Sequence, residues 1–305
     1  MKCWSLPFLR LLQLASLTML VLCTLSCHQS LTDMEQQNDV YYWRTDLHLS
    51  QAERQFLLDH HIRKVYCRYF DVVMDETDRP RPNATLTFSD TLPVGIELVP
   101  TVYITEDCMH EHHDSLAALL VRRILQMNET NGIRGVHEIQ IDCDYTSCSR
   151  HIFYDFLKEV KAELASHLTS HTSHTLILSA TIRLHQLQME APPVDYGVLM
   201  LYNTGDPRRF RERNPILDER DVQPYAKYLA DYPLPLAAAY PVYRWQRQVE
   251  GVRIEHTVDK DVILSVKQLV EQKRPALRNA ILTYHLDEEN INRYDPQTYE
   301  AIYHH

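Results

Sequence analysis

The stretch that decides the fold reads His137-Glu-Ile-Gln-Ile-Asp-Cys-Asp-Tyr-Thr146. Successive side chains of a strand point to opposite faces, so this strand has one polar face and one apolar face. The polar face carries Glu138, Gln140, Asp142 and Asp144, and the apolar face carries Ile139, Ile141 and Cys143. Helices on the outside of a sheet cover its apolar face, so the polar row must look into an enclosed interior or a ligand. This arrangement predicts a closed parallel barrel.

A second stretch, residues 176–184, repeats the same inversion. Ser179, Thr181 and Arg183 share one face with His185, while the residues between them are apolar. Two successive strands with polar rows toward one enclosed side do not suit a sandwich core. They suit the mouth of a (β/α)8 TIM-type barrel, where catalytic groups lie at the carboxyl ends of the strands. Asp142 and Asp144 are at that end.

The rest of the chain predicts eight strand-helix pairs. Strands are expected at residues 40–43, 64–70, 97–105, 137–146, 176–184, 198–202, 236–240 and 280–286. Helices are expected at residues 114–127, 147–167, 218–232, 263–271 and 294–303. A further helix begins after Ser50, which forms a capping box with Glu53. The Asp- and Pro-rich residues 75–93 predict a long excursion with a short strand at 84–88, and Gly251 predicts a hairpin.

Composition excludes several functions. The 305 residues fit one barrel, which typically needs roughly 250. A formal net charge of −10 repels nucleic acid and anionic membrane surfaces, so neither is expected as an electrostatic partner. Only 6 glycines are present, and no phosphate-cradling glycine motif occurs among them. We therefore expect no nucleotide cofactor.

The amino terminus predicts export. Lys2 and Arg10 flank the start of an apolar run at residues 11–25, which ends in Thr24-Leu-Ser-Cys27. This segment resembles a bacterial lipoprotein signal peptide, with Ser26 before the acylated Cys27. A plain secretory signal and an uncleaved anchor are the alternatives.

The resemblance divides the chain into a signal peptide (1–26), a flexible tether (27–38) and a barrel domain (39–305). It implies a membrane partner through a lipid on Cys27. The expected location is the bacterial cell envelope, as an outer-membrane lipoprotein facing the periplasm or the surface.

Cysteine and histidine spacing gives no metal site. The four cysteines after Cys27 are Cys67, Cys108, Cys143 and Cys148, and buried free thiols are expected because no C-x-x-C pair occurs. His110, His112 and His113 surround Glu111, yet adjacent histidines cannot all point at one ion. We expect a solvated loop there and no bound metal.

Asp142 and Asp144 carry the chemical hypothesis. Residues two apart on a strand have Cα atoms about 6.6 Å apart, so both side chains can flank one reacting group. Crowded carboxylates differ in pKa, which yields an acid and a stabiliser from one residue type. Glycoside hydrolysis commonly uses such a pair. We take Asp144 as the general acid and Asp142 as its modulator; the alternative is a structural pair held by Arg183.

The motif Gln140-Ile-Asp142-Cys-Asp144-Tyr145 resembles the D-x-D-x-E-Y strand motif of chitinase-type glycoside hydrolases. Gln140 stands in place of the first Asp, Asp142 matches the second, and Asp144 stands where the catalytic Glu is expected. Asp144 is one methylene shorter than Glu. Loss of that acid is how relatives of these enzymes become lectins, so the resemblance implies either glycan hydrolysis or glycan binding.

A broader resemblance spans nearly all of the mature chain. It rests on Tyr41-Tyr-Trp-Arg44, Glu138-Ile-Gln-Ile-Asp-Cys-Asp-Tyr145, Ser179-Ala-Thr-Ile-Arg-Leu-His-Gln186, Pro192-Pro-Val-Asp195, Leu201-Tyr-Asn203 and Tyr232-Pro-Leu-Pro-Leu236. Together these stretches resemble a family of Bacteroidota lipoproteins with a predicted barrel. That resemblance implies a location and a fold, and it implies no activity.

Residues at the other strand ends complete the predicted site. The expected substrate-binding residues are Gln140, Arg183, His185, Tyr202, Asn203, Asp71, Trp245 and His285, with Tyr243 as a further ring for stacking. Three readings remain: a glycoside hydrolase-like enzyme, a non-catalytic glycan-binding or accessory lipoprotein, and a structural envelope protein. The last predicts a mouth plugged by residues 75–93 and 204–217.

Overall fold

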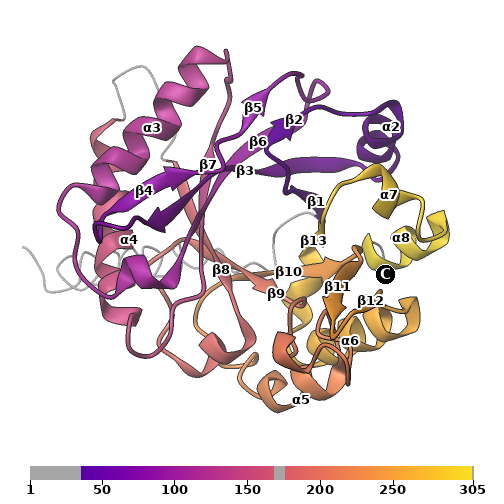
Figure 1. The fold of residues 1–305 in the computed structure, drawn as a ribbon. Helices are drawn as coiled ribbons and strands as arrows, with labels where there is room; N and C mark the ends of the chain where they lie inside the picture. Colours follow the sequence, from indigo (N-terminus) through magenta and orange to yellow (C-terminus); the bar gives the residue numbers. More distant parts are fainter. Residues whose placement is uncertain (1–35, 168–175, 304–305) are drawn as a thin grey trace, which may run out of the picture. The chain divides into compact units, whose positions relative to one another are not determined.

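Eight parallel strands close into a ring in the computed structural model, which describes residues 36–167 and 176–303 (Figure 1). Each strand pairs with the next one around the ring, and the eighth strand pairs back with the first. In ring order the strands are β1 (Gln37–Tyr42), β3 (Ile62–Met74), β6 (Glu97–Ile104), β7 (Glu138–Cys143), β8 (Ile177–Ile182), β9 (Tyr196–Met200), β10 (Leu236–Pro241) and β13 (Ala280–Tyr284). The predicted (β/α)8 barrel is confirmed.

The inverted alternation of β7 also holds. Ile139, Ile141 and Cys143 are buried in the core between the ring and the helices. Gln140 lies opposite Ser179 of β8 in the parallel register, with both side chains fully buried on the inner side. The inside of the ring is therefore a polar throat. Its remaining space is filled by a separate set of buried side chains that includes Tyr41, Tyr66, Val99, Val198, Met200 and Leu282.

Helices surround the ring on its outer side (Figure 1). They are α2 (Gln51–Asp59), α3 (Leu116–Thr130), α4 (Arg150–Ser166), α5 (Glu219–Ala226), α6 (Lys260–Lys273), α7 (Glu288–Ile291) and α8 (Pro296–Tyr303). The first of them begins with the predicted capping box, because Ser50 accepts from the Glu53 amide at 3.2 Å and Glu53 accepts from the Ser50 amide at 2.9 Å. Short 3-10 helices occur at η2 (Glu106–Met109), η4 (Pro207–Arg209) and η5 (Pro275–Asn279).

Two strands are not followed by an α-helix, so the expectation of eight complete strand-helix pairs was wrong, although the excursion at residues 75–93 with a short strand within 84–88 is confirmed. After β3 the chain forms β4 (Pro80–Asn83), antiparallel to the end of β3, and β5 (Thr87–Phe88), which pairs with β2 (Asp46–Leu47). After β8 only the 3-10 helix η3 (Leu184–Gln188) follows. Prolines explain both cases, since Pro80, Pro82 and the pair Pro192-Pro193 cannot continue a helix.

A hairpin leaves the ring after β10. Its strands are β11 (Trp245–Val249) and β12 (Val252–His256), which pair in antiparallel register. Glu250 and Gly251 form the turn with φ values of +50° and +79°. Positive φ at both central residues gives the tight hairpin turn that matches strand twist, and glycine adopts it at no steric cost. The predicted hairpin across Gly251 is confirmed.

The amino-terminal predictions fall mostly outside the described residues. The signal peptide (1–26) and Cys27 lie there, while the last two residues of the expected tether, 37 and 38, belong to β1. Within residues 36–167 and 176–303, none of the helices combines the length and apolar character needed to cross a bilayer.

The four cysteines that follow Cys27 are free thiols. Cys67, Cys108 and Cys143 are buried, as expected, whereas Cys148 is exposed. Cys148 differs because it lies past the end of β7 in the loop before α4, on the solvent side of the mouth.

Candidate active site at the barrel mouth

The polar residues of β7 form three layers in the throat. In the lowest layer the Glu138 carboxylate is fully buried and accepts from Lys64 Nζ at 2.8 Å and from Ser179 Oγ at 2.5 Å. The Tyr196 hydroxyl donates to the same carboxylate, and Tyr66 Oη is 2.5 Å from Tyr196 Oη. Both carboxylate oxygens of Glu138 are therefore used inside the protein, which agrees with a structural role.

Gln140 forms the middle layer. Its Oε1 accepts from Tyr41 Oη at 2.8 Å, and its Nε2 donates to Ser179 Oγ at 3.4 Å. The side chain is fully buried beneath the mouth. Gln140, predicted to bind substrate, thus lies below the surface that a ligand can reach; instead it links β7 to the neighbouring strand β8 and, across the throat, to β1.

Asp142 lies in the upper layer, almost fully buried. Thr181 Oγ1 donates to its Oδ1 at 2.5 Å, and Arg183 Nη2 is 3.9 Å from the same oxygen. Burial raises the pKa of Asp142 to about 6, although the Arg183 guanidinium opposes that rise and the Asp144 charge adds to it. A buried carboxyl loses hydration of its charged form, which is why its proton is held more tightly.

Asp144 follows β7 and reaches the surface of the mouth, with 43% of its side chain exposed. Arg183 Nε donates to its Oδ1, and this ion pair joins the ends of the fourth and fifth strands of the ring. The nearby charges of Asp144 and Asp142 add to burial in raising the pKa of Tyr103 to about 12. The two predicted carboxylates do converge at the mouth, and one guanidinium lies against both.

The loop after β8 is fixed to the loop after β7. Gln186 Oε1 accepts from the Arg183 amide at 2.8 Å, and Gln186 Nε2 donates to the Tyr145 carbonyl oxygen at 3.0 Å. His185 Nε2 is 3.3 Å from the same oxygen. These contacts hold Arg183 and His185 at the mouth, even though β8 itself ends at Ile182.

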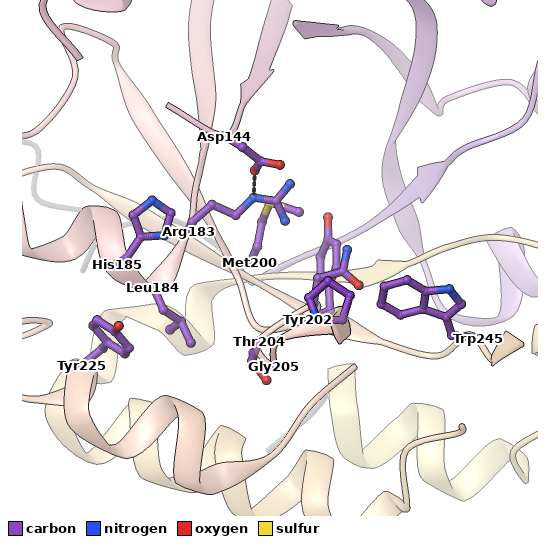
Figure 2. A pocket seen from close by; sticks show the side chains of 12 residues that line it. Asp144, Arg183, Leu184, His185, Met200, Tyr202, Thr204, Gly205, Tyr225 and Trp245 are labelled. Atoms are coloured by element: carbon purple, nitrogen blue, oxygen red, sulfur yellow. Dashed lines mark hydrogen bonds and ion pairs between the residues drawn. The ribbon is translucent and has the colours of Figure 1, made fainter. Parts of the chain in front are cut away.

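A pocket of about 370 Å³ opens beside Asp144 and Arg183 (Figure 2). It is lined by Asp144, Arg183, Leu184, His185, Met200, Tyr202, Asn203, Thr204, Gly205, Pro207, Tyr225 and Trp245. Figure 2 shows the Asp144–Arg183 pair on one side, with Tyr225 and Trp245 on either side of Tyr202. The site combines one charged edge with aromatic walls, as ligand pockets commonly do.

The Trp245 wall is built by two segments outside the ring. Phe210 packs edge-to-face on Trp245 at a ring distance of 5.4 Å, and His256 Nε2 is 2.6 Å from the Phe210 carbonyl oxygen. Arg247 Nη1 also donates to the Pro207 carbonyl oxygen at 3.0 Å. Residues 204–217 therefore form a side of the pocket and do not plug it, contrary to the plugged-mouth expectation for that loop.

Six of the predicted site residues line this pocket: Asp144, Arg183, His185, Tyr202, Asn203 and Trp245. Asp142 lies beneath it. Asp71 lies inside β3, where the strand continues to Met74, and it accepts from Arg68 Nε at 2.7 Å. His285 is half-buried, with its Nδ1 enclosed, and Tyr243 donates to Asn203. Neither Asp71, His285 nor Tyr243 reaches the pocket surface.

Several lining residues were not among the residues predicted from sequence. Thr204, Gly205 and Pro207 follow directly after Asn203, so extending the strand-end rule by a few residues would have included them. Met200 belongs to the inward face of β9. Tyr225 lies on α5, and its position depends on how that helix packs, which no local pattern indicates.

The histidine segment before α3 behaves as the solvated loop that was expected. His110 Nε2 is 2.7 Å from Glu106, whereas His112 Nε2 is 2.8 Å from Glu159 of α4. The two rings thus serve different carboxylates. No group of three metal-binding side chains was found in the part of the chain that the structure describes.

Comparison with known proteins identifies the fold class. No protein-family model matches the chain, and no curated protein sequence matches it. Among solved structures, a GH18 chitinase from Cycas revoluta in complex with (GlcNAc)3 has a TM-score of 0.58 and 10% identity, covering 88% of this chain and 100% of its own. The chain therefore has the TIM-barrel fold of the GH18 chitinases.

Two further solved structures widen the range of functions on this fold. The spore cortex-lytic enzyme SleL of Bacillus cereus has a TM-score of 0.55 and 14% identity, covering 88% of this chain and 74% of its own. A chitinase-like agglutinin from Robinia pseudoacacia has a TM-score of 0.50 and 13% identity, covering 87% and 98%. Lytic enzymes and an agglutinin share this barrel, so the fold leaves the activity to the site.

Proposed function

We propose that this protein binds a glycan in the mouth pocket and does not hydrolyse it. The aromatic rings of Trp245 and Tyr225 offer apolar surface to a sugar ring, and Asp144 and Arg183 offer an acceptor and donors to its hydroxyl groups. Tyr202 is buried and stacks on Tyr284, so it supports the pocket from below. The barrel similarity to chitinases and to an agglutinin supports a glycan as the ligand class.

One observation carries the choice of binding over hydrolysis: Arg183 Nε donates to Asp144. Asp144 stands where the chitinase resemblance expects the catalytic Glu. A general acid must present its proton to the leaving-group oxygen, whereas the ion-paired carboxylate here accepts a hydrogen bond. The side chain is also one methylene shorter, so it reaches less far from β7.

Hydrolysis remains the second candidate because of Asp142. Burial raises the pKa of Asp142 to about 6, so its carboxyl keeps a proton to a higher pH than a free aspartic acid does, as a general acid must. Asp142, however, does not line the pocket, and Thr181 donates to it from the neighbouring strand. A sugar in the pocket therefore meets Asp144 before it can meet Asp142.

The experiment is to incubate the full mature chain with a panel of oligosaccharides and to measure both binding and released reducing sugar. We expect saturable binding without product. Trp245→Ala should weaken binding at least about fivefold, since a lost aromatic contact costs about 1 kcal/mol or more. Tyr228→Ala, which removes a ring outside the pocket, is the matched control and should bind as the parent does.

Released sugar that disappears in Asp144→Asn would overturn the non-catalytic assignment in favour of hydrolysis. Absence of binding across the panel, with the parent shown to be folded, would refute the glycan-binding function.

For location, we propose a lipid anchor on Cys27 that holds the barrel at the bacterial cell envelope. The support is the sequence at residues 1–27 and the polar residues that precede β1. Mass spectrometry of the purified mature protein should detect an acylated amino-terminal Cys27. An unmodified mature chain, or one beginning at another residue, would contradict the anchor.

A further inference from the structure

The charges at the mouth are not balanced. Asp142 and Asp144 bring two carboxylates against the single guanidinium of Arg183, which is 3.9 Å from Asp142 and hydrogen-bonded to Asp144. The next pair, Arg68 with Asp71, cancels its own charge. At pH 7, above the raised pKa of Asp142, a cluster of formal charge −1 therefore lies at the base of a pocket whose other lining residues are neutral, counting His185 as neutral.

One carboxylate oxygen of this cluster, Asp144 Oδ2, is accessible to a ligand. Asp144 uses Oδ1 for Arg183, whereas its Oδ2 accepts no hydrogen bond from any residue in 36–167 or 176–303. With 43% of the side chain exposed on the pocket, this oxygen can accept a donor from a ligand. A charged donor gains most, because an ammonium supplies three N–H groups and a charge-assisted hydrogen bond.

The surroundings favour a cation over an anion. Trp245 lines the pocket with an aromatic ring, and the faces of such rings attract cations. The cations nearest the rim are engaged elsewhere: Arg208 pairs with Asp206, and Arg247, which is exposed to water, donates to the Pro207 carbonyl oxygen. A ligand carboxylate in the pocket would be repelled by Asp144, and every guanidinium nearby already has a partner.

We propose that the pocket selects a glycan bearing a protonated primary amine, an amino sugar without its acyl group, with the ammonium placed against Asp144 Oδ2. This inference rests on the proposed glycan binding and names the chemical class of the ligand. Arg183 then acts as a positioning residue, because it fixes the carboxylate that receives the ammonium.

The test uses two matched trisaccharides, (GlcNAc)3 and its fully deacetylated counterpart (GlcN)3, titrated into the full mature chain with the amines protonated. We expect (GlcN)3 to bind at least tenfold more tightly. The preference should shrink as salt is raised, because exposed charge interactions are screened. Equal binding, or tighter binding of (GlcNAc)3, overturns this inference while leaving glycan binding intact; binding of neither refutes both.

Two substitutions of Asp144 separate charge from shape. Asp144→Asn keeps an oxygen for Arg183 but removes the charge, so the preference for (GlcN)3 should fall below twofold. The preference is the ratio of the two affinities measured on the same variant, and urea denaturation beside the parent reports whether the variant is folded. Asp144→Glu keeps the charge and should keep the preference. An Asp144→Asn variant that still selects (GlcN)3 would overturn the assignment.

Discussion

The two ends of the throat hold similar groups in different states. At the lower end Glu138 meets Lys64, Ser179 and Tyr196, and both of its oxygens have partners inside the barrel. At the upper end Asp144 meets Arg183 through one oxygen and leaves the other at the pocket. Both carboxylates belong to one alternating polar row. The difference teaches that unused hydrogen-bonding capacity, and not polarity alone, marks the position where a ligand can bind.

The largest effect is expected for a substitution at the lower end of the throat. Glu138→Gln keeps acceptors for Ser179 and Tyr196 but leaves the mostly buried Lys64 ammonium without its ion-pair partner. We expect the free energy of unfolding to fall by about 3 kcal/mol, since removal of one charge from a buried pair strands the other. Urea denaturation measures this loss. A change below about 1 kcal/mol would show that the lower cluster is not a stabilising ion pair.

Asp39 provides a pH test of the same end. Burial raises its pKa to about 7, against the lowering effect of Lys64. The folded chain therefore binds an extra proton between pH 3.8 and about 7, and stability from this group is lost as pH rises through that window. In the parent, the free energy of unfolding should fall by a few kcal/mol across this pH window, and Asp39→Asn should remove that fall. Urea midpoints for parent and variant on both sides of the window measure it; parallel pH profiles would contradict it.

The smallest effect is expected at the upper end. Asp142→Asn makes the same carboxylate-to-amide change as Glu138→Gln, four positions further along the chain. Arg183 still has Asp144, and the Asn oxygen still accepts from Thr181, so stability above pH 7 should change by less than about 1 kcal/mol. The same urea assay applies. A loss as large as that of Glu138→Gln would mean that the two ends are energetically equivalent.

Sequence alone identified the ring of strands because side-chain alternation is a local property. The inversion at Ile139, Ile141 and Cys143 depends only on which neighbours are apolar, and the capping box at Ser50 depends on two residues three apart. The excursion after β3 was predicted from its prolines. The absence of an α-helix after β8 could have been predicted in the same way, since Pro192 and Pro193 interrupt that segment.

The site was predicted only in part because its walls come from long-range packing. Asp144, Arg183 and Asn203 follow from strand-end positions, which a pattern gives directly. Tyr225 depends on the packing of α5, and Trp245 depends on Phe210 from another loop. The rule also included Asp71 and His285, which do not line the pocket. Asp71 accepts from Arg68 inside the protein, and a sequence pattern cannot count such hydrogen-bond partners.

The hairpin β11–β12 has a consequence for how such a protein can diversify. It carries Trp245 yet contributes no strand to the ring, and its antiparallel pairing is complete in itself. Exchanging residues 246–255 would therefore change the rim of the pocket without changing the strands of the ring. Loops on a rigid scaffold commonly vary in this way. New ligand preferences could evolve there while the ring keeps its stability.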